Sequence, residues 1–73
     1  LNLIINLNLI ILDEEEKKII NTLLLNQGSV YQSDLIKDTQ LTKVKITRIL
    51  DKLEGKSLIE RKRRGMTNIV ILK

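Results

Sequence analysis

The sequence predicts a small α+β domain with a three-helix core, a small antiparallel sheet and one protruding hairpin. Three observations predict it: a capped apolar stripe within residues 13–28, a basic amphipathic stretch at 42–54, and two strand-like runs around Gly65. Seventy-three residues are enough for one small domain. We divide the chain into an N-terminal apolar extension, residues 1–12, and a folded domain, residues 13–73.

The composition excludes several kinds of chemistry. The chain has no cysteine and no histidine, so disulfides, zinc fingers and histidine-based catalysis are excluded. No nucleophile–base pair or metal-ligand set is present, and we expect a protein that is not an enzyme and that needs no cofactor or metal. Tyr31 is the single aromatic residue, which removes the stacking platforms of most readers of single-stranded nucleic acids. The absence of cysteine is typical of a cytoplasmic protein.

The charge is divided unevenly along the chain. Residues 1–28 carry four acids against two lysines, whereas residues 29–73 carry eleven Lys/Arg against five Asp/Glu. A positive field confined to one part of the chain predicts an anionic partner, although a basic surface that only confers solubility is the alternative. No segment reaches the ~18–20 apolar residues of a membrane span.

Residues 1–12 alternate with a period of two, and every odd position is apolar. This pattern favours an apolar β-strand, which joins the sheet or forms a dimer contact. Two alternatives remain open: an N-terminal dimerisation helix, and the tail of a membrane tether that precedes Leu1.

The first helix is predicted to begin at Asp13. Asp13 and Glu16 have the spacing of a capping box, and Gly28 can end the helix in a left-handed conformation. The short stretch from Ser29 to Tyr31 is β-prone, and we expect Tyr31 to be half-buried core.

A second short helix is predicted from Asp34 to Thr39, with Ser33 as its cap. Leu35 and Ile36 would face inward. Because free backbone N–H groups gather at a helix start, Gln32 and Ser33 are candidate phosphate contacts.

The third helix, capped by Thr42, separates into two faces. Its core face holds Ile46, Ile49, Leu50 and Leu53. An apolar residue on the opposite face, Val44, could meet a thymine methyl in a major groove, and Arg48 could bind guanine. The candidate base-reading residues are Val44, Lys45, Thr47 and Arg48. The candidate phosphate contacts here are Thr42, Lys43 and Lys52.

A tight turn joins the second and third helices, which makes a helix–turn–helix. The runs 58–62 and 67–72 read as two strands of a hairpin whose tip carries Lys62, Arg63, Arg64 and Gly65. Together with Arg61, these cations would repel one another unless an anion lies nearby. We therefore expect them to form a wing that contacts phosphates.

The segment that combines these features is LTKVKITRILDKLEGKSLIERKRRG. It resembles the recognition helix and wing of winged helix-turn-helix transcription regulators of the MarR type, and especially the short winged-helix domains common in archaeal proteins. The resemblance covers about residues 31–72, and residues 13–28 fit the first helix of that fold. It implies a dimeric regulator that binds double-stranded DNA, sometimes gated by a small ligand.

The chain departs from that pattern at several points. Gln40 and Ser57 stand where the pattern often has glycine, and a left-handed Ser57 would cost about 1 kcal/mol unless Gly55 moves the break. The long dimerisation helices of full MarR proteins are absent.

Two functions remain in competition. The first is the double-stranded DNA-binding domain of a transcription regulator, which captures duplex electrostatically and reads its sequence in the major groove. The second is a winged-helix protein-interaction module that binds no DNA.

Overall fold

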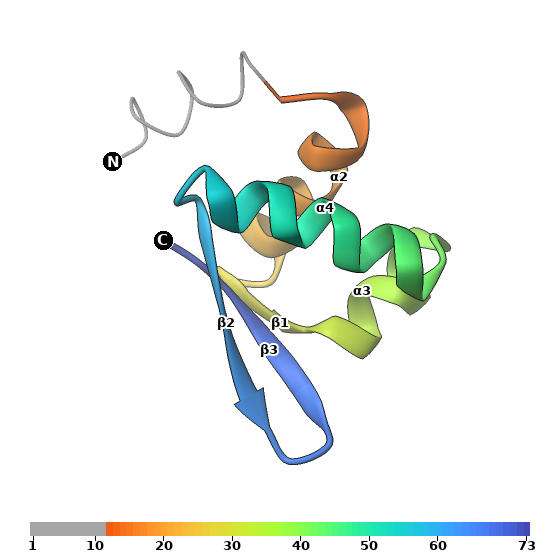
Figure 1. Cartoon of the computed structure of the whole chain (residues 1–73), viewed down its shortest axis with the longest axis vertical. Helices are drawn as coiled ribbons and strands as arrows, with labels where there is room; N and C mark the ends of the chain where they lie inside the picture. Colours follow the sequence, from red (N-terminus) through yellow and green to blue (C-terminus); the bar gives the residue numbers. More distant parts are fainter. Residues whose placement is uncertain (1–11) are drawn as a thin grey trace.

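The computed structural model describes residues 12–73. Residues 1–11, which carry the predicted N-terminal strand and its alternatives, lie outside the described part. The described chain forms helix α2 (Glu14–Leu25), strand β1 (Ser29–Tyr31), helices α3 (Gln32–Thr39) and α4 (Lys43–Gly55), and strands β2 (Ile59–Arg64) and β3 (Thr67–Leu72). This order is that of a winged helix-turn-helix, as predicted (Figure 1).

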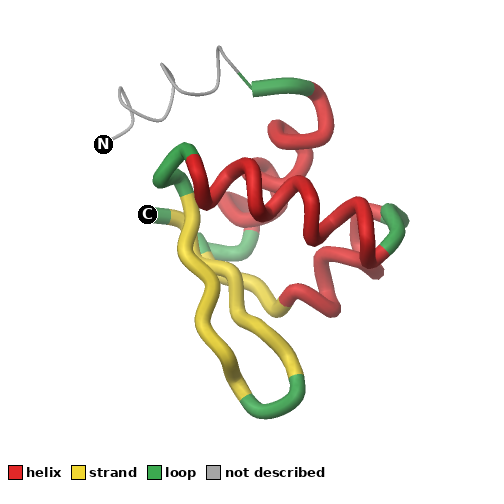
Figure 2. The backbone as a smooth tube through the Cα atoms, in the orientation of Figure 1, coloured by secondary structure: helices red, strands yellow, loops and turns green. Residues whose placement is uncertain are grey.

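The three strands form one antiparallel sheet in the order β1-β3-β2. Val30 of β1 pairs with Val70 of β3, and both are buried. The β2–β3 hairpin continues past the helices as an arm, which is the wing (Figure 2).

One apolar core joins the helices to the base of the sheet. The predicted core face of α4 is confirmed, because Ile46, Ile49, Leu50 and Leu53 are all buried. Leu12 is also buried, although it belongs to no helix or strand. The remaining buried apolar residues are Ile19, Ile20, Leu23, Val30, Leu35, Leu58, Ile59 and Val70.

The start of α2 is confirmed in detail. Asp13 accepts a hydrogen bond from the Glu16 backbone N–H at 2.8 Å, and the Asp13 N–H donates to Glu16 Oε1 at 3.1 Å. The helix ends earlier than predicted, at Leu25. Gln27 and Gly28 both take positive φ, and the Gly28 N–H donates to the Leu23 carbonyl.

Two predictions around α3 are wrong. Ser33 does not cap this helix: α3 begins one residue earlier, at Gln32, and its N-cap residue Tyr31 makes no side-chain cap. Tyr31 lies outside the core and is 45% exposed, because the alternation of β1 turns only Val30 inward.

The breaks before and after α4 both use left-handed backbone without glycine. Gln40 has φ 60° and Ser57 has φ 62°. Gly55 does not move the second break, because it is the last residue of α4.

Candidate nucleic-acid interface

The outward face of α4 is the centre of the candidate interface. Thr42 caps the helix as predicted, accepting from the Lys45 N–H at 3.1 Å. Val44 is 69% exposed, and Arg48 is exposed as well. These two side chains line a hollow of about 390 Å³ with Lys43, Thr47 and Asp51. The structure therefore places the predicted Val44 and Arg48 side by side on an accessible surface.

Two lysines of α4, and the C-cap residue Lys56 directly after it, are not free on that surface. They form ion pairs with the acids at the start of α2, because residues 45, 52 and 56 recur on one side of the helix. The pairs are Lys45–Glu15 at 2.9 Å, Lys52–Asp13 at 2.9 Å and Lys56–Glu16 at 2.8 Å.

These pairs bear on two predicted contacts. Lys45 was expected to read bases and Lys52 to meet phosphate, yet both ammonium groups lie against carboxylates of α2. Both pairs are about half exposed, so their carboxylates can be exchanged for other anions. Lys56 differs, because its partner Glu16 is only 2% exposed.

A second hollow, of about 470 Å³, separates α3 and α4 from the wing. Three cations line it, Lys43 from α4 and Arg61 and Arg63 from β2. Its other lining residues are Gln32, Ser33, Ile36, Thr47, Met66, Thr67 and Asn68. The hollow is thus a groove between α4 and the wing, lined by both polar and apolar side chains.

A chain of side-chain hydrogen bonds crosses the floor of this groove. Asn68 of β3 donates to Gln32 Oε1 at 3.2 Å, and Gln32 Nε2 donates to the Thr47 hydroxyl at 3.4 Å. Thr47 in turn donates to the Lys43 carbonyl at 2.9 Å. Gln32 and Thr47 therefore link α3, α4 and the wing, and their polar atoms are largely committed within the domain. Ser33 is exposed and stays available for the predicted phosphate contact.

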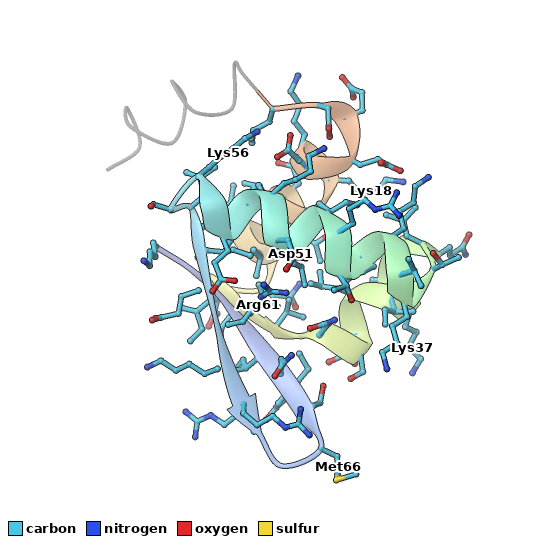
Figure 3. All side chains as sticks on the ribbon, viewed as in Figure 1. Lys18, Lys37, Asp51, Lys56, Arg61 and Met66 are labelled. Carbon is cyan, nitrogen blue, oxygen red and sulfur yellow. The ribbon has the colours of Figure 1, made fainter. Side chains whose placement is uncertain are left out.

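The wing differs from its prediction in two ways. Lys62, Arg63 and Arg64 belong to β2, and the turn falls at Gly65 and Met66. Gly65 takes the predicted positive φ of 60°. Met66 projects from the tip and is 93% exposed (Figure 3).

Strand alternation then divides the wing cations between two faces. Arg61 and Arg63 line the groove, so Lys62 and Arg64 project from the other face. Arg63 Nε donates to the Gly65 carbonyl at 3.0 Å, which holds this side chain near the tip.

The expected repulsion among four cations is reduced within the domain itself. Arg61 is 20% exposed and contacts Asp51 and Glu54 of α4, the former at 2.6 Å (Figure 3). Burial alone would lower the pKa of Arg61, but the hydrogen bonds to Glu54 and Asp51 outweigh it and raise the pKa. Arg61 thus joins the base of the wing to α4 and remains charged.

The α2–α4 contact also perturbs titration. The pKa of Asp13 is lowered from its ordinary value of 3.8, chiefly by the hydrogen bond from the Glu16 N–H and then by Lys52. The pKa of Lys52 is raised from 10.5, chiefly by its hydrogen bond to Asp13. Both groups are held in their charged forms.

Sequence reasoning missed the acids that form ion pairs between α2 and α4 and between α4 and the wing. Asp13, Glu15 and Glu16 were interpreted only as a helix start, and Asp51 and Glu54 received no role. The seven-residue interval between Lys45 and Lys52 indicates a shared helix side, but no local signal names the element on that side.

Two features are absent from the described residues, 12–73. No helix there has the length and apolar character needed to cross a membrane. No group of three or more potential metal ligands gathers within that part of the chain.

Comparison with known proteins places the chain in a family. Neither the curated proteins nor the solved structures contain a match. Residues 11–73 match the family described as a domain of unknown function, DUF7343. Because that match covers most of the chain, this protein belongs to the DUF7343 family.

Proposed function

We propose that this chain is a double-stranded DNA-binding domain of a transcription regulator. In this proposal α4 enters the major groove and the wing contacts flanking phosphates. The observation that carries it is the position of Lys43, Arg48 and Arg63. Within residues 12–73 their side chains make no ion pair with an acid, and they line two hollows that share Lys43 and Thr47.

The chemistry of this surface suits a duplex. Arg48 and the exposed Val44 are one turn apart, so a guanine edge and a thymine methyl could be read by neighbouring side chains. Arg63, Lys62 and Arg64 supply cations for the phosphate backbone, which contributes affinity without sequence information. Lys45 and Lys52 join them only after separation from their α2 acids.

Fluorescence anisotropy with a labelled random-sequence duplex of about 20 base pairs tests this function. We expect binding that weakens with salt, with a log–log slope of about −0.9 for each phosphate neutralised. Arg64→Ala should weaken binding, whereas Lys73→Ala removes an equal charge at the end of β3 away from the wing and should have little effect. Absence of binding at about 50 mM salt would overturn the proposal.

A protein-interaction module is the second candidate. Val44 and Met66 are large apolar side chains exposed by 69% and 93%, and they stand on the two elements that border the groove. A protein partner could cover both. This function predicts that the wild type does not bind duplex in the same assay and that substitution of the surface cations makes no difference there.

We also propose that the domain acts as a cytoplasmic homodimer. Leu24 and Leu25, at the end of α2, are 47% and 85% exposed and could contribute to a contact between copies. Sedimentation equilibrium at micromolar concentration tests this assembly. A monomer at all concentrations, with and without duplex, would contradict it.

A further inference from the structure

The contact between Glu15 and Lys45 joins the start of α2 to the candidate reading helix. The carboxylate oxygen and the ammonium nitrogen are 2.9 Å apart. The Lys45 side chain is 50% exposed and that of Glu15 is 41% exposed, so the pair lies at the edge of the surface that would face a duplex. A phosphate that approached Lys45 would meet an ammonium group already neutralised by a carboxylate.

Glu15 is separable from the capping of its helix. Asp13 and Glu16 make the two hydrogen bonds of the capping box, and Glu16 is also buried against Lys56. Glu15 makes no capping hydrogen bond, and its side chain forms an ion pair with Lys45 alone among residues 12–73. The stability of α2 therefore does not require Glu15 to reach toward α4.

The strength of the pair decides what it can do. A half-exposed ion pair contributes about 0–1 kcal/mol, because water and salt screen it and both side chains lose freedom. Such a pair is weak enough to open when a phosphate competes for the lysine. It is strong enough to reduce the net gain from that new contact.

We propose that Glu15 is an intramolecular competitor for the phosphate or base edge that Lys45 would contact. Opening the pair is a cost of every encounter with DNA, so Glu15 reduces the affinity of the domain for duplex of any sequence. This inference rests on the proposed DNA-binding function and concerns the regulation of the same surface.

Glu14 provides a matched control. It precedes Glu15 in the first turn of α2, carries the same charge and has the same favourable relation to the helix dipole. Its side chain is 93% exposed and, among residues 12–73, pairs only with Lys17 of its own helix, at 3.7 Å. Glu14→Gln and Glu15→Gln thus change the net charge equally, but only the second releases Lys45.

The experiment measures the affinity of four variants and the wild type for the labelled random duplex across a salt series. The variants are Glu15→Gln, Glu14→Gln, Lys45→Met and the double variant Glu15→Gln/Lys45→Met. Glu15→Gln should bind about two- to fivefold more tightly than Glu14→Gln, which is the range that a surface pair of this strength permits. Its log–log salt slope should become steeper by up to about 0.9, the contribution of one further phosphate contact.

The double variant separates a local effect from a general one. If Glu15 acts through Lys45, Glu15→Gln should produce no gain beyond that of Glu14→Gln once Lys45 is methionine. Equal gains from Glu14→Gln and Glu15→Gln, or a gain that persists in the double variant, would overturn the inference while leaving DNA binding intact. Failure of every protein, including the wild type, to bind at about 50 mM salt would overturn the proposed function and this inference together. Thermal unfolding followed by circular dichroism verifies that each variant is folded.

Discussion

At the scale of single residues, Arg48 is the side chain that most directly tests whether the domain recognises DNA bases. It is exposed on the outward face of α4 beside Val44, and its guanidinium can form two hydrogen bonds with a guanine. We expect Arg48→Ala to lose preference at one base position, with a loss of about 1–3 kcal/mol there. Selection of binding sites from a random duplex library, with wild type and variant in parallel, measures it. A uniform loss over all selected sequences would indicate a phosphate contact instead.

Ser57 offers a test of backbone strain at one residue. Its φ of 62° is a left-handed conformation that costs a residue with a Cβ about 1–2 kcal/mol. Ser57→Gly should therefore raise the free energy of unfolding by about 1 kcal/mol, or the melting temperature by about 4–8 °C. Ser33→Gly is the control: Ser33 lies in the first turn of α3, where glycine should stabilise nothing. Urea unfolding measures both, and a destabilised Ser57→Gly protein would contradict the expectation.

At the scale of elements, the wing contains two arginines of the same strand with different roles. Arg61 contacts Asp51 and Glu54 of α4, whereas Arg64 is exposed on the other face of the hairpin. Arg61→Ala should lower the free energy of unfolding by about 1–2 kcal/mol, because two carboxylates lose a shared partner. Arg64→Ala should change it by less than about 0.5 kcal/mol, as is usual for an exposed side chain.

The affinity for DNA should show the reverse order, with the larger loss in Arg64→Ala. Arg64→Ala should weaken binding to all sequences alike and flatten the log–log salt slope by about 0.9. Anisotropy and urea unfolding on both proteins provide the comparison. A strong stability loss in Arg64→Ala, or none in Arg61→Ala, would contradict the division of roles.

The elements themselves could largely be predicted, because their signals are local. The apolar period of α4, the capping box at Asp13 and the alternation of β3 each lie within a few residues. The hairpin turn lies further along the chain than predicted. Basic residues can adopt strand conformation, and pairing with β3 extends β2 to Arg64. That pairing is a property of two strands together.

The candidate site could be predicted only in part. A helical wheel correctly turns Val44 and Arg48 outward, since that depends on one helix. It does not reveal that α2 lies beside Lys45, a contact between residues thirty positions apart. The same limit applies to Gln32, which looked free to bind phosphate and instead connects Asn68 to Thr47.

At the scale of the whole molecule, the response to pH follows from the charged groups. The lowered pKa of Asp13 means that its contribution to stability is complete above 3.8, its ordinary value, and is lost as pH falls through the folded-state pKa. The raised pKa of Lys52 means that its contribution is complete below 10.5 and is lost as pH rises through its folded-state value. The chain has no histidine or cysteine, so we expect stability to vary little between about pH 5.5 and 8.

Carboxyl carbon chemical shifts in an NMR titration can test the origin of this behaviour. Lys52→Met removes one of the groups that stabilise the Asp13 carboxylate, so the pKa of Asp13 should rise toward 3.8. The backbone hydrogen bond from Glu16 remains and should keep part of the shift. An unchanged Asp13 titration would show that Lys52 has no part in it.

The strand order β1-β3-β2 has a consequence for how the domain is made. The central strand, β3, is the last of the described elements to be synthesised, and neither β1 nor β2 has another strand to pair with until it emerges. The sheet therefore assembles only after α2, α3 and α4 have left the ribosome. The same holds for the part of the core that the sheet contributes through Val30 and Ile59. Since pairing of β1 with β3 closes a loop of about forty residues, this late step should set the rate of folding. A nascent chain arrested before Thr67 has exited should remain sensitive to protease, and gain protection only once β3 is free to pair.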